Sequence, residues 1–260
     1  MPTFAANLSM LWPELDVYDR FRAASEAGFK RVEILFVHVL DRGRIADLLD
    51  ELGLELVLFD PSPGDWEAGE RGLACIPGRQ DEFRATVRDA LQTAQRVGTR
   101  RLNALVGIKP PGVDDLQARR TVVANLTEMA GPAQDAGAML LVENINTTDM
   151  PGYFVSTVER AAEIVEAVDR PNVRLQLDQY HVGMMGGDAR ELLRRYRDLV
   201  EHVQIADVPG RHEPGTGQQP IPAFLDELDA LGYRGAVGLE YRPSGATDAA
   251  LEWLPRERRG

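Results

Sequence analysis

The sequence of 260 residues has little cysteine and histidine and no long apolar run. Its single cysteine, Cys75, excludes a disulfide framework and a cysteine metal cluster, and we expect it to be a small buried residue. Four histidines are too few to build a site for several zinc ions. No segment approaches the ~18 consecutive apolar residues of a membrane-spanning helix. The first residues, MPTFAANLSMLWPELD, lack the basic and then apolar pattern of a signal peptide, so we expect a cytoplasmic protein.

Positive charge is also scarce. The chain has 29 Lys and Arg residues against 41 Asp and Glu residues, which gives a net charge of −12. A chain with this charge repels phosphate backbones, so we expect no nucleic-acid partner. A small anionic substrate remains compatible with the composition if the site itself supplies local positive charge.

The remaining composition is typical of a soluble globular protein, with 44% hydrophobic and 27% charged residues. That balance is sufficient to bury a sizeable core. The length alone is compatible with one large domain or two small ones. Linkers rich in proline or serine and low-complexity segments are absent, so we predict a single domain over residues 1–260.

Short apolar runs alternate along the chain with longer segments of helical periodicity. We predict eight strands, at residues 3–7, 31–36, 54–60, 100–106, 138–143, 173–178, 202–206 and 236–240. We predict helices at 16–27, 79–97, 114–136, 156–168, 188–196 and 221–231, several of which end just before a glycine. Eight strands interleaved with helices in about 250 residues predict an α/β fold of the (β/α)₈ TIM-barrel type. A doubly wound sheet would usually have a glycine-rich phosphate turn after its first strand, where this chain reads AANLSM.

One connection is too long and too rich in glycine for a plain loop. Residues 61–78 read PSPGDWEAGERGLACIPG and follow the third predicted strand. Long ordered loops are often functional, so we predict a rim or lid at the mouth of the barrel. A surface excursion without a role is the alternative.

Oxygen-bearing side chains end four of the predicted strands. Glu143 closes MLLVE, Asp178 closes VRLQLD, and Glu240 closes AVGLE. Gln204 lies near the end of VEHVQIAD. A buried carboxylate is costly unless it is paired or bound to a cation, and the carboxyl ends of barrel strands form the active site. We therefore predict that these four side chains converge on one divalent cation, with Mg²⁺ or Mn²⁺ favoured by the oxygen ligands.

Two of these acids can also move protons. Glu143 and Glu240 lie three strands apart and can face each other across a small substrate. A metal ion that binds two adjacent substrate oxygens acidifies the neighbouring C–H bond and stabilises the resulting enediolate. We predict that one glutamate removes the proton and the other returns one at the adjacent carbon. Salt-bridged strand ends are the alternative for each acid taken alone.

Two further residues are candidates for substrate binding. His181, in the segment Asp178-Gln-Tyr-His, lies one helical turn beyond the predicted ligand and can hydrogen-bond a substrate oxygen. Arg211, in GRHEPGTG, follows the seventh strand, and its guanidinium fork matches a carboxylate. A buried supporting histidine and a surface arginine are the alternatives. His202 carries no motif, and we interpret it as structural.

The chain resembles the hydroxypyruvate isomerase family of xylose isomerase-like barrels over nearly its whole length. The shared segments are FAANLSMLW, PGDWEAGERGLACIPGR, LNALVG, VENINTTDMPGYF, QLDQYH, HVQIADVPGRHEPGTG and GLEYRP. The resemblance implies isomerisation of hydroxypyruvate, a small carboxylate, to 2-hydroxy-3-oxopropanoate (tartronate semialdehyde). It implies Glu143 and Glu240 as proton donor and acceptor, and Glu143, Asp178, Gln204 and Glu240 as metal ligands. Related epimerases usually carry histidine at the position of Gln204. The resemblance also allows a homo-oligomer.

The same residues are also compatible with other functions. An isomerase of a four-carbon oxo-acid, such as an oxo-tetronate, would use the same site. A ketose 3-epimerase would use the two glutamates and the metal on a longer neutral sugar, without a carboxylate partner for Arg211. A retaining glycosidase would need its two carboxyl groups about 5 Å apart. A DNA-repair nuclease would need a richer metal set and a basic face, and a binding protein would keep the barrel without catalysis.

Overall fold

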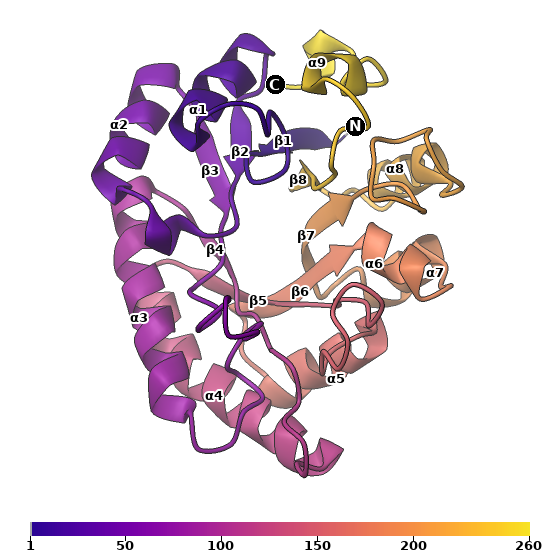
Figure 1. Cartoon of the computed structure of the whole chain (residues 1–260). Coiled ribbons are helices and arrows are strands. Elements are labelled where there is room, and N and C mark those ends of the chain that lie inside the picture. The colour runs from indigo at the N-terminus through magenta and orange to yellow at the C-terminus, as the bar shows by residue number, and fades with distance from the viewer. Residues whose placement is uncertain (1) are drawn as a thin grey trace.

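The computed structural model describes residues 2–260 and has eight parallel strands that surround a central axis (Figure 1). The strands are β1 (Thr3–Asn7), β2 (Arg31–Glu33), β3 (Glu55–Leu58), β4 (Arg101–Asn103), β5 (Met139–Glu143), β6 (Val173–Asp178), β7 (Val200–Ile205) and β8 (Ala236–Leu239). Their order is β3-β2-β1-β8-β7-β6-β5-β4. The backbone N–H of Asn103 donates to the carbonyl of Phe59 at 3.1 Å and so joins the two ends of this series. The predicted TIM barrel is confirmed.

Helices cover the outside of the barrel (Figure 1). They are α1 (Val17–Glu26), α2 (Arg42–Leu52), α3 (Gln80–Val97), α4 (Asp115–Asp135), α5 (Val158–Val168), α6 (Gln179–Met184), α7 (Ala189–Tyr196), α8 (Ile221–Ala230) and α9 (Thr247–Ala250). The sequence analysis missed α2, α6 and α9. Helix α2 is polar and carries a glycine in its first turn, but Asp41 caps it, and Ile45, Leu48 and Leu49 form its buried side.

Most strands are shorter than predicted because their apolar runs continue into loops over the mouth. Strand β2 ends at Glu33, although the run extends to residue 36. Beyond it, the N–H of Leu35 donates to the hydroxyl of Ser9 at 2.9 Å instead of to a neighbouring strand. Strand β7 begins at Val200, two residues earlier than predicted. The last residues of these apolar runs therefore belong to loops and not to the sheet.

The barrel interior is apolar at one level and polar at the next. Ala5, Val57, Leu141 and Ala236 are buried together inside the barrel. Nearer the carboxyl ends of the strands, the interior contains the buried polar residues Asn7, Glu33, Gln176, His202 and Gln204. Successive strand residues point to opposite faces, so the alternate residues pack outward against the helices. A closed apolar floor thus lies below a polar chamber.

Residues 61–78 connect β3 to α3 and pack against the connection that follows β4. The N–H of Cys75 donates to the carbonyl of Val106 at 2.9 Å, and Gly72 forms a bridge with Val106. Cys75 is free and buried, as expected. Trp66 of this segment packs against Phe36 with a ring distance of 5.0 Å. The segment therefore lies beside the loop that follows β2, and its role as a lid stays a prediction.

Glycine is required where these two connections meet. A Cβ added to Gly107, at φ +98°, would lie 2.2 Å from the carbonyl oxygen of Gly72. Gly69 has a similar φ of +92° but open space around it. Gly69→Ala should cost about 1–2 kcal/mol in free energy of unfolding from the backbone conformation alone. Gly107→Ala should cost about 1–3 kcal/mol more because the backbones must separate. Urea titration of both variants measures this difference, and equal costs would contradict the close approach.

Across residues 2–260, the structure contains no helix that is both long and apolar enough to span a membrane.

Candidate active site

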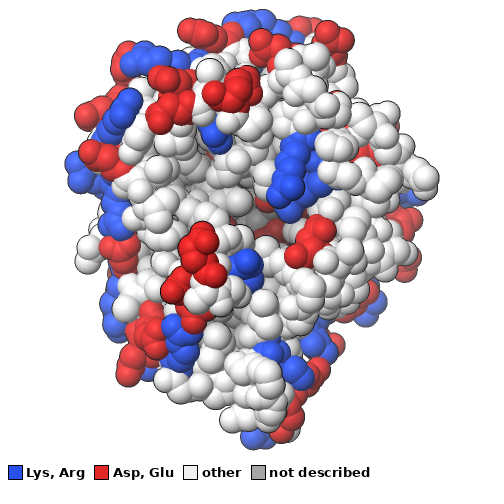
Figure 2. Space-filling view, viewed as in Figure 1, with Lys and Arg blue, Asp and Glu red and all other residues white. Residues whose placement is uncertain are grey.

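The four side chains predicted to converge lie at the carboxyl ends of neighbouring strands. Glu143 is the last residue of β5, Asp178 is the last of β6, and Glu240 directly follows β8. Gln204 lies one residue before the end of β7, and the sheet register pairs it with Asp178. All four are at most 5% exposed. Figure 2 shows a hollow in the middle of this face, with acidic side chains at its bottom.

Asp178 leaves one carboxylate oxygen available to a ligand. Its Oδ1 caps helix α6 by accepting the backbone N–H groups of Tyr180 at 2.8 Å and His181 at 3.4 Å. Its Oδ2 is buried and accepts no hydrogen bond from any residue in the range 2–260. The nearest charged or titratable partners are Nε2 of His181 at 3.5 Å and a guanidinium nitrogen of Arg211 at 3.7 Å. A buried free oxygen of this kind is a strong candidate ligand atom.

Glu143 is held by a residue that the sequence analysis did not name. The side-chain amide of Asn103, on β4, donates to Glu143 Oε2 at 2.6 Å. The other oxygen, Oε1, lies 3.8 Å from Nε2 of His181. One oxygen is therefore fixed by hydrogen bonding, and the second faces the chamber.

Arg211 is the positive group among these acids. Its guanidinium lies 2.6 Å from Glu240 Oε1 and packs over the ring of Tyr180, and its side chain is only 14% exposed. It lies in the connection after β7, where Asp207 accepts the backbone N–H groups of residues 208, 215, 217 and 219 at 2.8–2.9 Å. Asp207 thus organises the loop that holds Arg211, which itself adopts φ +57°. The predicted surface alternative for Arg211 does not match this burial.

His181 presents an N–H group to the chamber. Its Nδ1 lies 2.6 Å from the side-chain nitrogen of Asn146. The oxygen of that amide accepts the N–H groups of Thr148 at 3.0 Å and Asp149 at 2.8 Å, so the nitrogen must face the histidine. His181 Nδ1 is therefore the acceptor, and Nε2 carries the proton. Burial and the nearby Arg211 hold the pKa of His181 well below its usual range, so the ring is a neutral donor suited to a substrate oxygen.

Gln204 is more constrained than the sequence indicated. Its amide nitrogen donates to Glu33 at 3.0 Å, and its oxygen accepts from the amide of Gln176 at 2.6 Å. A carbonyl oxygen has two lone pairs, so this hydrogen bond leaves one for another partner. His202 lies beside it and contacts the same Glu33 at 2.9 Å, consistent with the structural role predicted for it.

The buried acids hold protons more tightly than exposed ones do. Burial raises the pKa of Asp178 to about 6, although Arg211 opposes the rise. Burial raises the pKa of Glu240 to about 8, again against the effect of Arg211. The pKa of Glu143 is raised well above its usual range by burial and by the charges of Glu240 and Asp178. Groups tuned toward neutrality are suited to both accepting and returning a proton.

These shifts predict how stability depends on pH in chelator-treated protein. A carboxyl group with a higher pKa when folded loses its contribution to stability as pH rises from the unfolded to the folded pKa. For Glu240 that range runs from 4.5 to about 8. Neutral His181 has the opposite effect only below about 6.5, its ordinary pKa. The melting temperature should therefore fall as pH rises from about 6.5 to about 8. Thermal melts should show a smaller fall in Glu240→Gln, and an unchanged slope would contradict the assignment.

The residues fit a divalent metal ion. Among residues 2–260, Glu143, Asp178 and His181 are the group of acidic, histidine or cysteine residues whose ligand atoms lie within 4.8 Å of one another. Because His181 keeps its Nε2 proton, we assign the ligand atoms to oxygens. The free Oδ2 of Asp178 and the second lone pair of Gln204 are suited to a hard cation.

The sequence analysis missed several buried partners of the site. Glu33 and Asp60 end or follow strands β2 and β3, and Asn103 ends β4. The signal for Asp60 was available, because it closes a predicted strand just as Glu143, Asp178 and Glu240 do. Burial and the charges of Glu240 and Glu33 raise the pKa of Asp60 well above its usual range. We therefore interpret it as a neutral acid beside the amide of Asn103.

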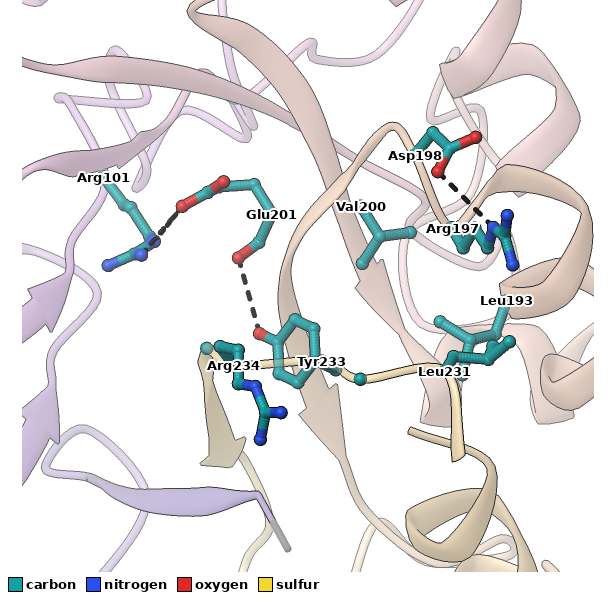
Figure 3. A pocket seen from close by; sticks show the side chains of 11 residues that line it. Arg101, Leu193, Arg197, Asp198, Val200, Glu201, Leu231, Tyr233 and Arg234 are labelled. Atoms are coloured by element: carbon teal, nitrogen blue, oxygen red, sulfur yellow. Dashed lines mark hydrogen bonds and ion pairs between the residues drawn. The ribbon is translucent and has the colours of Figure 1, made fainter. Parts of the chain in front are cut away.

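A separate cavity of about 660 Å³ opens at the opposite end of the barrel (Figure 3). It is lined by residues that begin strands β4 and β7 and by the loop before β8, including Arg101, Glu201 and Tyr233. Arg101 pairs with Glu201 at 2.7 Å, and the hydroxyl of Tyr233 donates to the carbonyl of Glu201 at 3.4 Å. This cavity is remote from Glu143, Asp178 and Glu240. Its volume alone does not indicate a catalytic role.

Comparison with known proteins identifies the family. The xylose isomerase-like TIM barrel family matches residues 21–257. The chain belongs to this family. Over 254 residues it is 42% identical to 2-oxo-tetronate isomerase from Cupriavidus necator, with 98% of both chains covered. It is 38% identical to hydroxypyruvate isomerase from Escherichia coli, with the same coverage. The resemblance to the hydroxypyruvate isomerase family is confirmed, because both of these full-length relatives are named as isomerases.

Solved structures agree on the fold of this xylose isomerase-like barrel. A chain described as an AP endonuclease of family 2 from Brucella melitensis is 44% identical, with a TM-score of 0.96 and coverage of 99% of this chain and 100% of that one. D-psicose 3-epimerase from Clostridium cellulolyticum H10, solved with D-tagatose, has a TM-score of 0.79 at 19% identity over 98% of this chain and 91% of that one. The second likeness concerns the fold alone.

Proposed function

We propose that this chain isomerises hydroxypyruvate to 2-hydroxy-3-oxopropanoate in the cytoplasm, through an enediolate and with Glu143 and Glu240 as acid and base. The observation that carries the proposal is the arrangement of Glu240, Asp178, Glu143 and Arg211 in one buried chamber. The neutral N–H of His181 faces the same chamber. The relatives named hydroxypyruvate isomerase and 2-oxo-tetronate isomerase support the reaction class.

The geometry supports a defined role for each residue in the proposed reaction. The substrate carboxylate binds the guanidinium of Arg211, and His181 donates a hydrogen bond to a substrate oxygen. One glutamate removes a proton from the terminal CH₂OH carbon, which gives the enediolate. The other glutamate delivers a proton to the central carbon, which becomes CHOH, while the terminal carbon becomes the aldehyde. The proton of the terminal hydroxyl moves to the oxygen of the central carbon in the same sequence. Atoms and charge then balance, since one C–H and one O–H bond break and one of each forms.

We propose Mg²⁺ or Mn²⁺ as the metal, held by Glu143, Asp178, Gln204 and Glu240. When bound, such an ion polarises adjacent substrate oxygens as a Lewis acid. The protein supplies the remaining conditions. Burial excludes bulk water from the acids, Asn103 fixes one oxygen of Glu143, and Arg211 balances part of the negative charge.

A four-carbon oxo-acid is the second candidate substrate. The relative named 2-oxo-tetronate isomerase is 42% identical to this chain, slightly more than the relative named hydroxypyruvate isomerase. Both substrates carry a carboxylate for Arg211. A neutral ketose lacks that carboxylate, and a nucleic-acid substrate would meet a chain of net charge −12. We therefore expect small carboxylates, and not ketoses or DNA, to be the substrates.

The two candidates are separated by parallel assays. Hydroxypyruvate, a 2-oxo-tetronate and a neutral ketose are each incubated with chelator-treated protein, without metal and then with Mg²⁺ or Mn²⁺, and products are identified by proton NMR. Metal-dependent turnover that is fastest with hydroxypyruvate supports the proposal. Faster turnover of the four-carbon acid transfers the assignment to that substrate, and turnover of the ketose alone contradicts the role of Arg211.

A further inference from the structure

A buried carboxylate that the proposed reaction does not use lies inside the barrel. Glu33, at the end of β2, is 1% exposed. Its Oε1 accepts the amide of Asn7 at 2.9 Å and the amide of Gln204 at 3.0 Å, and its Oε2 lies 2.9 Å from Nε2 of His202. A buried carboxylate without partners would be strongly destabilising. Three donors from two other strands therefore fix this side chain in one orientation.

The contact between Glu33 and Gln204 spans the barrel interior. Strands β2 and β7 are separated in the sheet by β1 and β8. A Cβ added to Gly238, on β8, would lie 2.4 Å from both carboxylate oxygens of Glu33. Glycine at this position therefore leaves the space through which Glu33 reaches β7. The contact is specific to this pair of residues and does not result from adjacency of their strands.

Glu33 determines which end of the Gln204 amide faces the acids. The nitrogen and oxygen of an amide have nearly the same shape, so hydrogen-bond partners set the orientation. Oε1 of Glu33 accepts the amide of Gln204 as well as that of Asn7, so the NH₂ group of Gln204 faces Glu33. The oxygen then faces β6, where it accepts the amide of Gln176 at 2.6 Å. Asp178 lies on the same strand, in register with Gln204.

We propose that Glu33 is a positioning residue, which holds the oxygen of Gln204 toward the metal ion and prevents the amide from turning its NH₂ group there. This inference rests on the proposed function, because it requires Gln204 to be a ligand. An NH₂ group has no lone pair suited to a cation, so a turned amide removes one ligand. Partners that orient metal ligands typically change metal affinity about 10–100-fold when replaced.

Glu33→Gln tests the inference directly. The new amide can face Gln204 with its oxygen or its nitrogen, so it no longer dictates the orientation. We expect the affinity of metal-free protein for Mn²⁺, measured by titration calorimetry, to fall about 10–100-fold. Asn7→Ala is the matched control, because Asn7 donates to the same oxygen of Glu33 and does not contact Gln204. This control should lower the melting temperature but leave Mn²⁺ affinity unchanged.

A double variant separates positioning from folding. In Glu33→Gln combined with Gln204→Glu, the amide at position 33 donates to a carboxylate at 204, which presents an oxygen on either side. We expect the double variant to bind Mn²⁺ more tightly than Glu33→Gln alone. Gln204→Glu alone places a second buried carboxylate against that of Glu33. It should therefore bind Mn²⁺ less tightly than the double variant. This pair also provides the test if Glu33→Gln does not fold.

The possible outcomes distinguish the two proposals. Weaker Mn²⁺ binding in Glu33→Gln alone, with recovery in the double variant, supports positioning. Equal affinity in wild type and Glu33→Gln overturns it, as do equal losses in Glu33→Gln and Asn7→Ala, which would indicate a structural role only. Wild-type protein that binds no Mn²⁺ overturns the proposed metal site, and this inference with it.

Discussion

Replacing Glu240 with glutamine should lower kcat about 10²–10⁴-fold while the barrel stays folded. Glutamine retains an oxygen that accepts the hydrogen bond from Arg211, seen at 2.6 Å in the native protein. Glutamine cannot ionise, so stability should fall less than in the wild type as pH rises toward about 8, the pKa of the native glutamate. What it loses is the ability to take or give the transferred proton. Turnover is measured at saturating Mn²⁺, and bound metal is determined separately so that a loss of ligand is not mistaken for a loss of proton transfer.

The matched control for Glu240→Gln is Glu213→Gln. Glu213 lies in the same connection as Arg211 and binds Ser244, outside the group of buried acids. This variant should retain the wild-type kcat. If Glu240→Gln retains more than about a tenth of the activity with metal bound, Glu240 has no role in proton transfer.

Replacing Arg211 should affect substrate binding and pH dependence together. Arg211→Lys keeps the charge but loses the planar fork, so the KM for hydroxypyruvate should rise about 10–100-fold, as expected for the loss of ~1.5–3 kcal/mol of charged hydrogen bonding. Arg211→Gln removes the cation that lowers the pKa of Asp178 and Glu240. Both pKa values should then rise, so the acidic limb of the profile of kcat/KM against pH should move to higher pH.

Arg242→Gln is the control for this prediction. Arg242 is exposed two residues beyond Glu240, and its substitution removes the same charge from the same end of the barrel. Its KM and pH profile should match those of the wild type. An Arg211→Gln variant with an unmoved acidic limb and an unchanged KM would remove Arg211 from the site.

The fold could be predicted because every strand and most of the longer helices carry a local signal of their own. Apolar runs, helix-ending glycines and their alternation are properties of short segments, and together they specify a barrel. Helix α2 was missed because its polar sequence, with Gly43 in the first turn, gives a weak periodic signal. The short extent of β2 depends on loop hydrogen bonds that join segments distant in sequence, such as the one that the N–H of Leu35 donates to the hydroxyl of Ser9.

The candidate site also has residues that could be predicted from the sequence and features that could not. Glu143, Asp178 and Glu240 could be named from sequence because carboxylates at the ends of apolar strands are unusual locally. The proton on Nε2 of His181 could not, because it depends on how Thr148 and Asp149 orient Asn146. The orientation of Gln204 depends on Glu33, which is 171 residues away in sequence. Such contacts exist only once the barrel has closed.

The most direct test of the central claim is the origin of the hydrogen on the central carbon of the product. Hydroxypyruvate is converted in D₂O with Mg²⁺ present, and product is observed by NMR at early times against a sample without protein. Proton transfer through an enediolate predicts that this carbon carries deuterium from the solvent. Product that forms at the catalysed rate but keeps the hydrogen of the substrate at this carbon would indicate a direct hydride shift, and would contradict the account of Glu143 and Glu240 as acid and base.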